Sequence, residues 1–174
     1  MISKIMTWDE CIQWVRSKQD LGERVVFTNG CFDLVHAGHV HLLQEASKFG
    51  DGLIVGINSD DSVRRLKGTS RPVMPLRDRL AVLAAFNVVD ALVVFPLDDQ
   101  SKDAESDILW DTPHSLLAQL CPDTLVKGGD YHEQDVIGRE FVREVRIVAL
   151  LEGRSSTELL KRAELISHTN ADLD

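Results

Sequence analysis

Two histidines three residues apart, His36 and His39, are the side chains in this sequence that are best placed to do chemistry. Across the start of a helix, this spacing puts both rings on one side of the first turn. Gly38 lies between them and has no Cβ, so a ligand can come close to the backbone there. For a lone histidine a structural role would be the better interpretation, but a pair after a glycine-containing loop favours binding or catalysis.

The two histidines would be positioned by a strand that leads directly into a helix. Val25 to Thr28 is a β-branched and aromatic run, Asn29-Gly30 breaks it, and apolar residues return at helical spacing from Val40 to Ala46. At such a junction the free N–H groups of the helix N-terminus and the positive end of its dipole converge, which favours a phosphate group. The sequence therefore predicts a phosphate site at His36 and His39.

The rest of the chain alternates between apolar runs of strand length and segments with helical periodicity. A capping box at Thr7 and Glu10 begins the first helix. The pattern predicts strands at 24–28, 53–58, 91–95, 124–127 and 146–151, and helices at 7–18, 38–49, 60–66, 76–86, 113–120, 135–144 and 155–166. This alternation is typical of a doubly wound parallel α/β sheet of the Rossmann-like type. We expect one domain over residues 1–174, with its core at 24–166 and a polar tail at 167–174.

The composition argues against several classes of protein. A net charge of -9 over 174 residues argues against a nucleic acid or an anionic membrane as the partner. No uncharged apolar run is long enough to span a membrane, and the first residues do not resemble a secretory signal, so we expect a cytoplasmic protein. The three cysteines are far apart and predict neither a zinc site nor a disulfide framework.

Charge is unevenly distributed along the chain. Between Arg64 and Arg79 there are six basic residues and one acidic residue, which suits a small polyanion such as a nucleoside triphosphate. Residues 98–111 contain six acidic residues and one lysine, and we interpret them as a solvated insertion.

Two later segments repeat features of the histidine site. Gly128-Gly129 follows a predicted strand, where the edge of an open α/β sheet binds ligands. Ser155-Ser156-Thr157 begins the last helix and adds a second helix N-terminus with hydroxyl groups. The sequence has no carboxylates paired as in a glycosidase, no Gly-x-Ser-x-Gly elbow and no Gly-Lys-Ser/Thr loop. What remains is a site that binds phosphates and acts by positioning and charge.

Four segments, in order, resemble a known family. TNGCFDLVHAGH, from residue 28 to 39, resembles the His-x-Gly-His signature of the nucleotidyltransferase superfamily. NSDDSVRRLKG at 58–68, VKGGDY at 126–131 and GRSST at 153–157 are most similar to the adenylyltransferases of ADP-heptose synthesis. The resemblance runs from about residue 24 to 161. The chain departs from the family in lacking a Gly-Gly turn before the last predicted strand and in the length of the acidic stretch.

The resemblance implies a role for each matching residue. His36, His39 and Lys67 would be catalytic and act on the α-phosphorus, while Arg79 and Asp33 are candidates for the substrate phosphate, with Asp33 better suited to fixing its loop. Binding of the nucleotide is expected from Thr28, Asn29, Gly30, Cys31, Phe32, Gly38, Lys127, Gly128, Asp130, Tyr131, Ser155, Ser156 and Thr157. No metal ligand is expected from the chain, because Mg²⁺ would be held mainly by the nucleotide phosphates.

The implied reaction transfers AMP from ATP to a heptose 1-phosphate, giving an ADP-sugar and pyrophosphate. Two alternatives stay open at this point: a cytidylyltransferase acting on glycerol 3-phosphate or a similar alcohol phosphate, and a nucleotide-binding module without turnover. Members of the family commonly associate, so we expect a homodimer whose partners are otherwise ATP and the sugar phosphate, with neither nucleic acid nor membrane.

Overall fold

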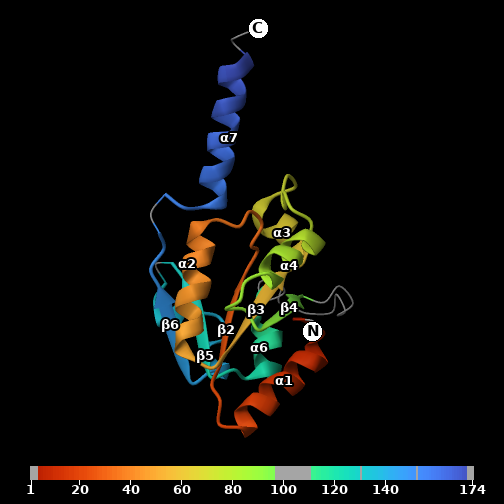
Figure 1. The fold of residues 1–174 in the computed structure, drawn as a ribbon, viewed down its shortest axis with the longest axis vertical. Coiled ribbons are helices and arrows are strands. Elements are labelled where there is room, and N and C mark those ends of the chain that lie inside the picture. Colours follow the sequence, from red (N-terminus) through yellow and green to blue (C-terminus); the bar gives the residue numbers. More distant parts are fainter. Residues whose placement is uncertain (1–3, 97–110, 130, 152, 172–174) are drawn as a thin grey trace.

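The computed structural model describes residues 4–96, 111–129, 131–151 and 153–171, with side chains up to residue 163. Six strands form one sheet in the order β1-β4-β3-β2-β5-β6, and all neighbouring strands in it are parallel (Figure 1). The strands are β1 (Ile5–Met6), β2 (Val25–Gly30), β3 (Gly52–Asn58), β4 (Ala91–Phe95), β5 (Thr124–Gly128) and β6 (Glu144–Val148). The doubly wound parallel α/β sheet predicted from the sequence is therefore confirmed.

Helices cover both faces of this sheet. They are α1 (Trp8–Asp20), α2 (Ala37–Ala46), α3 (Asp60–Lys67), α4 (Leu76–Ala84), α6 (His114–Leu120) and α7 (Ser156–Ala171), with short 3₁₀ turns η1 (Ser47–Phe49), η2 (Glu133–Asp135) and η3 (Arg139–Phe141). One buried apolar cluster joins α1 and α6 to one face of the sheet, and a second joins α2 and α4 to the other. Consecutive residues of β2 point to opposite faces of the sheet, because Phe27 lies in the first cluster and Val26 in the second.

The chain changes direction across the sheet at the pair β2 and β5. From β2 the chain adds β3 and β4 on one side, and then returns to place β5 and β6 on the other. In open parallel sheets, the crevice at the carboxyl ends of the strands where the order reverses is where ligands bind. Asn29-Gly30 and Lys127-Gly128 end these two strands.

Most predicted elements are present with shifted ends. The capping box of α1 is formed, since Thr7 N donates to Glu10 Oε2 at 2.7 Å and Glu10 N to Thr7 Oγ1 at 3.3 Å. Pro113 is the N-cap of α6 instead of its first residue. The last helix continues to Ala171, into the stretch that we predicted to be a polar tail.

The helix predicted at 135–144 is wrong. The segment forms η2, η3 and the start of β6 instead. Gly138 has φ of +89°, and Leu117 of α6 fills the space where a Cβ would lie. A left-handed residue packed against another helix cannot continue a right-handed helix, so the chain turns there.

The sequence did not predict β1, because two residues carry no strand pattern. Ile5 and Met6 pair with Leu92 and Val93 at the edge of the sheet. The acidic stretch 98–111 lies outside the described residues except for Asp111, which accepts hydrogen bonds from Arg65 at 2.7 to 3.2 Å.

Candidate active site

His36 and His39 lie at the start of α2, as the sequence predicts. His36 is the N-cap, and its Nδ1 accepts a hydrogen bond from Gly38 N at 3.1 Å. The two imidazole rings are stacked, with their centroids 3.9 Å apart and their planes 22° from parallel. The pair therefore presents two adjacent rings at the positive end of a helix dipole.

Both histidines are poor bases in this position. Burial, with smaller contributions from the charges of His36 and Lys67, lowers the pKa of His39 to about 4. Burial and the charge of Lys67 also lower the pKa of His36. At neutral pH these rings are uncharged, so each carries one N–H donor, and His39 also makes a hydrogen bond with the Leu34 backbone.

Lys67 ends α3 and is exposed, yet its charge acts on both histidines. It differs from the other basic residues between Arg64 and Arg79, which pair with nearby carboxylates. These pairs are Arg64 with Asp61, Arg65 with Asp111, Arg71 with Asp33, Arg77 with Asp78 and Arg79 with Asp60. Of the six basic residues expected to face a polyanion, Lys67 is the one with no carboxylate partner in the part of the chain that the structure describes.

A second helix N-terminus meets the first. A Cβ added at Gly38 would lie 2.9 Å from the carbonyl oxygen of Arg154, just before α7. The buried Ser156 Oγ donates to Leu34 O at 3.2 Å, and the exposed Ser155 Oγ accepts from Glu158 N at 3.1 Å. Glycine at position 38 therefore permits the close approach of two segments more than a hundred residues apart. Thr157 is exposed on the first turn of α7.

The loop between β2 and α2 is folded tightly. Thr28 is fully buried, and Asn29, Gly30 and Cys31 are half-buried at the strand end. Phe32 has φ of +46°, which is rare for a bulky residue, and its buried ring lies 5.0 Å from the ring of His39. Burial raises the pKa of the Cys31 thiol, so this cysteine is no reactive thiolate.

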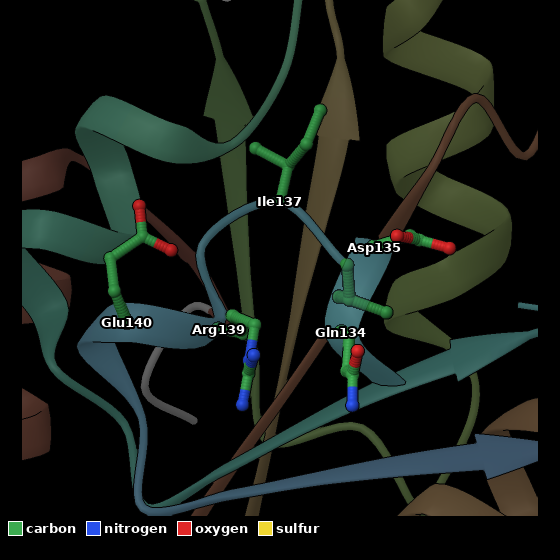
Figure 2. Close-up of a pocket in the computed structure, with 6 residues that line it drawn as sticks. Gln134, Asp135, Ile137, Arg139 and Glu140 are labelled. Atoms are coloured by element: carbon green, nitrogen blue, oxygen red, sulfur yellow. The ribbon is translucent and has the colours of Figure 1, made fainter. Parts of the chain in front are cut away.

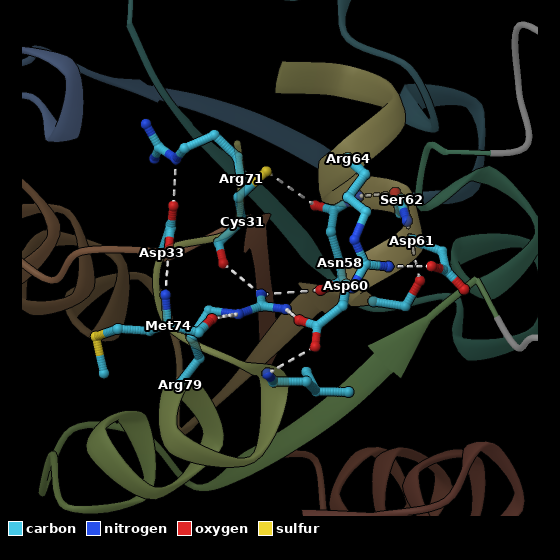
Figure 3. A network of polar contacts seen from close by, with 12 residues as sticks. Cys31, Asp33, Asn58, Asp60, Asp61, Ser62, Arg64, Arg71, Met74 and Arg79 are labelled. Carbon is cyan, nitrogen blue, oxygen red and sulfur yellow. Dashed lines mark hydrogen bonds and ion pairs between the residues drawn. The ribbon is translucent and has the colours of Figure 1, made fainter. Parts of the chain in front are cut away.

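Asp33 fixes this loop to the segment before α4. It is buried, accepts from Val73 N at 2.8 Å and from Met74 N at 2.9 Å, and pairs with Arg71 (Figure 3). Burial alone would raise the pKa of Asp33, but the two backbone donors and the guanidinium group together hold it below its usual value. This geometry suits the loop-fixing role and leaves little of the carboxylate for a substrate phosphate.

Arg79, which the sequence suggests as a contact for a substrate phosphate, is engaged by the protein itself in the structure. Its side chain is fully buried, and its guanidinium group donates to Met74 O at 3.1 Å, Cys31 O at 2.6 Å, Asn58 O at 2.9 Å and Asp60 Oδ1 at 2.6 Å (Figure 3). With these donors engaged and the group out of solvent, Arg79 holds α4 against the ends of β2 and β3.

Lys127 and Gly128 end β5 beside the end of β2. Lys127 Nζ donates to Asn29 Oδ1, and burial lowers the pKa of Lys127 to about 8. A Cβ added at Gly128 would lie 3.3 Å from Leu150 and 3.4 Å from Leu42, so the glycine permits close packing. The Tyr131 side chain is exposed, whereas Asp130 lies outside the described residues.

Three buried polar side-chain atoms have no hydrogen-bond partner among the described residues: Thr28 Oγ1, His39 Nδ1 and Arg71 Nη2. An unsatisfied buried polar atom costs free energy, so such atoms often mark the place of a ligand. Thr28 and His39 were predicted site residues. Arg71 was not singled out, because nothing next to it in sequence shows that it pairs with Asp33.

The residues Gln134, Asp135, Val136, Ile137, Arg139 and Glu140, around η2 and η3, line a hollow (Figure 2), and its volume is about 500 Å³. It contains none of the predicted site residues. Within the described ranges, no group of three or more histidine, cysteine, aspartate or glutamate residues could hold a metal ion. The helices that the structure describes include none long and apolar enough to cross a membrane.

Several curated proteins are similar in sequence to most of this chain. The bifunctional protein HldE of Sulfurimonas denitrificans is 47% identical over 158 residues, which are 91% of this chain and 30% of that protein. The protein of the same name from Wolinella succinogenes is 44% identical over 161 residues, 92% of this chain and 31% of that protein. The chain thus spans about 30% of the length of these relatives.

Two solved structures share the fold. The lipopolysaccharide core biosynthesis protein from Thermoplasma volcanium matches with a TM-score of 0.54 and 27% identity, over 75% of this chain and 98% of that one. A pantoate-beta-alanine ligase from Francisella tularensis matches with a TM-score of 0.59 over 83% of this chain and 66% of that one, and at 16% identity it shows the fold alone.

A family model described as cytidylyltransferase-like matches residues 27–170, a range that includes both helix N-termini and the stacked histidines. Since this match covers most of the chain, the protein belongs to the cytidylyltransferase-like family and is a nucleotidyltransferase.

Proposed function

We propose that the protein transfers AMP from ATP to a sugar 1-phosphate of the heptose type, releasing pyrophosphate. The observation that carries the proposal is the meeting of two helix N-termini beside the stacked His36 and His39. Backbone N–H groups, uncharged imidazoles and Lys67 then surround one point, where they can stabilise charge that develops on phosphoryl oxygens.

The acceptor needs no general base for this reaction. A sugar phosphate has its second pKa near ~6, so it is largely dianionic at neutral pH. One of its oxygens forms a bond to the α-phosphorus as the bond from that phosphorus to the bridging oxygen breaks, and pyrophosphate leaves with the electron pair. Histidines with lowered pKa values suit this chemistry, because donors are required and a base is not.

We assign roles on this basis. His36, His39 and Lys67 stabilise the charge at the α-phosphorus, and the backbone from Thr28 to Phe32 holds the phosphates close to the strand end. Ser155, Ser156 and Thr157 serve the β- and γ-phosphates at the start of α7. Arg71, whose buried Nη2 has no partner among the described residues, is added to this group. Mg²⁺ would accompany the nucleotide, bound mainly through phosphate oxygens, and would offset negative charge there.

The comparisons support the acceptor class as well as the reaction. The structural relative from Thermoplasma volcanium is described as a lipopolysaccharide core biosynthesis protein, which fits a sugar phosphate as the acceptor. A cytoplasmic location and the absence of a nucleic acid partner fit a protein of this charge that uses ATP and a small phosphate.

The test is to incubate the purified protein with each nucleoside triphosphate and a panel of sugar and polyol phosphates, and to follow pyrophosphate. We expect release with ATP and a heptose 1-phosphate, and none from a variant in which both His36 and His39 are alanine. Release with CTP and glycerol 3-phosphate but not with ATP would establish the cytidylyl alternative. Tight nucleotide binding without release from any pair would identify a module that has lost turnover.

A further inference from the structure

Strand β6 lies at one edge of the sheet, and its outer side meets no further strand in the part of the chain that the structure describes (Figure 1). Its inner side pairs with β5 in parallel, where Glu144 N donates to Asp123 O at 3.1 Å. In a parallel ladder alternate residues bond to the same neighbouring strand. The backbone N–H and C=O groups of Val145 and Ile147 therefore point outward from the sheet.

The flank of β6 is open as well. A hollow of about 310 Å³ lies along it, beside the 3₁₀ turns η2 and η3. Charged residues of both signs line this hollow: Glu133, Arg139, Arg143, Glu144 and Arg146. An edge strand whose backbone groups can be reached is a template for another strand, so the charges along it decide which strand can pair there.

Two opposite charges lie side by side on this edge. Val145 and Ile147 pack against the apolar cluster on the α1 and α6 face, so Glu144 and Arg146 lie on the opposite face. There the guanidinium carbon of Arg146 is 5.6 Å from the centre of the Phe49 ring. Arg146 also forms an ion pair with Glu144 within the strand, and both side chains stay partly exposed. Each can therefore still meet a charge from outside.

This pattern fits a second copy of the same strand. In an antiparallel pair related by a two-fold axis at Val145, the residue opposite Glu144 is Arg146 of the second copy. Each glutamate then lies next to two arginines, one from each strand, which is favourable. An axis shifted by one residue would place the two Arg146 side chains opposite each other, which is unfavourable. The charges on the edge therefore select one register and oppose the neighbouring one.

The backbone groups agree with the register centred on Val145. Since the N–H and C=O groups of Val145 both point outward, its two copies would form a hydrogen-bonded pair at the centre of the contact. Leu150 and Leu151, which follow soon after β6, are exposed. They can extend the contact beyond the strand and add the apolar area that a lasting dimer requires.

We propose that β6 is the contact strand of a homodimer, in which two copies pair antiparallel about Val145 and join their sheets into one. The contact is isologous, so it closes and leaves neither copy of β6 at a free edge. A second copy of this chain is the partner that fits, because it presents Glu144 and Arg146 in reverse order. The inference goes beyond the proposed function and does not depend on which nucleotide or acceptor the protein uses.

Charge reversal tests the register, with sedimentation velocity over a range of concentrations as the measurement. Glu144→Arg and Arg146→Glu should each raise the dissociation constant of the dimer roughly 10- to 100-fold, since each creates two like-charge pairs across the axis. The double variant should recover most of the loss, and Arg16→Glu, on the exposed side of α1, should match the wild type. A monomeric wild type, a dimer that both reversals leave unchanged, or no recovery in the double variant would overturn the inference.

Cross-linking tests the same contact without relying on its strength. Val145→Cys is made in a Cys121→Ser background, which lacks the exposed native thiol, and a short bismaleimide is added. The two Val145 Cα atoms would be about 5.5 Å apart, so we expect a covalent dimer on denaturing electrophoresis. Ser17→Cys in the same background, at an exposed position on α1, should stay monomeric. Any other pattern at these two positions would overturn the inference, even if the charge variants fail to fold.

Discussion

His39 is an unusual histidine because its pKa lies well below neutral pH, so its ring does not exchange protons at physiological pH as histidines commonly do. Its pKa of about 4 follows mainly from burial, and its Nδ1 has no partner among the described residues. A ring in this state can act only through hydrogen bonding and position. It therefore suits charge stabilisation better than proton transfer.

Replacing either histidine by alanine should test that role. If the rings act on charge that develops as the α-phosphorus becomes five-coordinate, His36→Ala and His39→Ala should each lower kcat by ~10²- to 10³-fold. Steady-state kinetics would measure this, with His41→Ala, in the same helix, as the control. A folded His39→Ala protein with near-normal kcat would show that the ring is structural.

The lowered pKa of His39 also predicts acid sensitivity. Between pH 6.5 and about 4 the unfolded chain takes up a proton at this residue and the folded chain does not, so stability must fall as the pH falls through that range. The full difference corresponds to about 3 kcal/mol at most. Urea denaturation at pH 7 and pH 4.5 should show a smaller loss for His39→Asn than for the wild type. Equal losses in both proteins would contradict the assignment.

Arg79 illustrates how a basic residue can resemble a ligand-binding group in sequence and serve the fold instead. Arg79→Met should destabilise the protein by about 3 to 5 kcal/mol, because Asp60 and three carbonyl groups lose their buried donor. Arg77→Ala, two residues away and exposed, should change stability by less than about 0.5 kcal/mol. Free energies of unfolding from urea titration of the two variants and the wild type would measure this difference. A stable Arg79→Met protein with a raised acceptor KM would restore the substrate role.

At the scale of elements, the site depends on the contact between the first turns of α2 and α7. Gly38 allows this contact, and the hydrogen bond from Ser156 to Leu34 maintains it. The first turns of the two helices are more than a hundred residues apart in sequence, so these contacts depend on the tertiary fold.

Gly38→Ala should therefore disturb nucleotide binding. The added Cβ would lie 2.9 Å from Arg154 O and from the ring of His36, so α7 or the ring must move. Overpacking of this kind costs about 1–3 kcal/mol, and if the whole cost falls on binding, the affinity for ATP drops roughly 5- to 150-fold. Calorimetric titration with ATP would measure it, with Ala37→Ser at the adjacent exposed position as the control. Unchanged affinity would mean that the two helix N-termini do not share a ligand.

At the scale of the whole molecule, the strand ends have different surroundings on the two faces of the sheet. The α2 face has the helix N-termini, and the α6 face has a cavity lined in part by Lys127. Lys67 and Arg71 come from the segment between β3 and α4.

The shape of the molecule also bears on assembly. Helix α7 stands clear of the sheet in Figure 1, and Leu150, Leu151 and Leu159 near its start are exposed. Exposed leucines of this kind favour association, and we predict a homodimer. Sedimentation at micromolar concentration should give about twice the chain mass of 19.4 kDa, and Leu159→Asp should shift the protein toward a monomer. A wild-type protein that sediments only as a monomer would contradict the prediction.

The sequence by itself determined the features that depend on near neighbours. The capping box at Thr7, the strand that leads into α2 and the histidine pair at its start are each decided within a few residues. Helix caps and hydrophobic periodicity are local properties, so a single sequence is enough to predict them.

Only the tertiary structure decided which distant residues share an environment. Arg79 is buried because carbonyl groups from β3 and from the loop after β2 converge on it, and Gly138 turns the chain because Leu117 packs against it. Lys127 faces the α6 side because its strand lies beside β2 in one particular register. The free energy of each arrangement depends on partners that lie about twenty to a hundred residues away in sequence. The spacing of residues along the chain does not reveal which of these distant residues will be in contact.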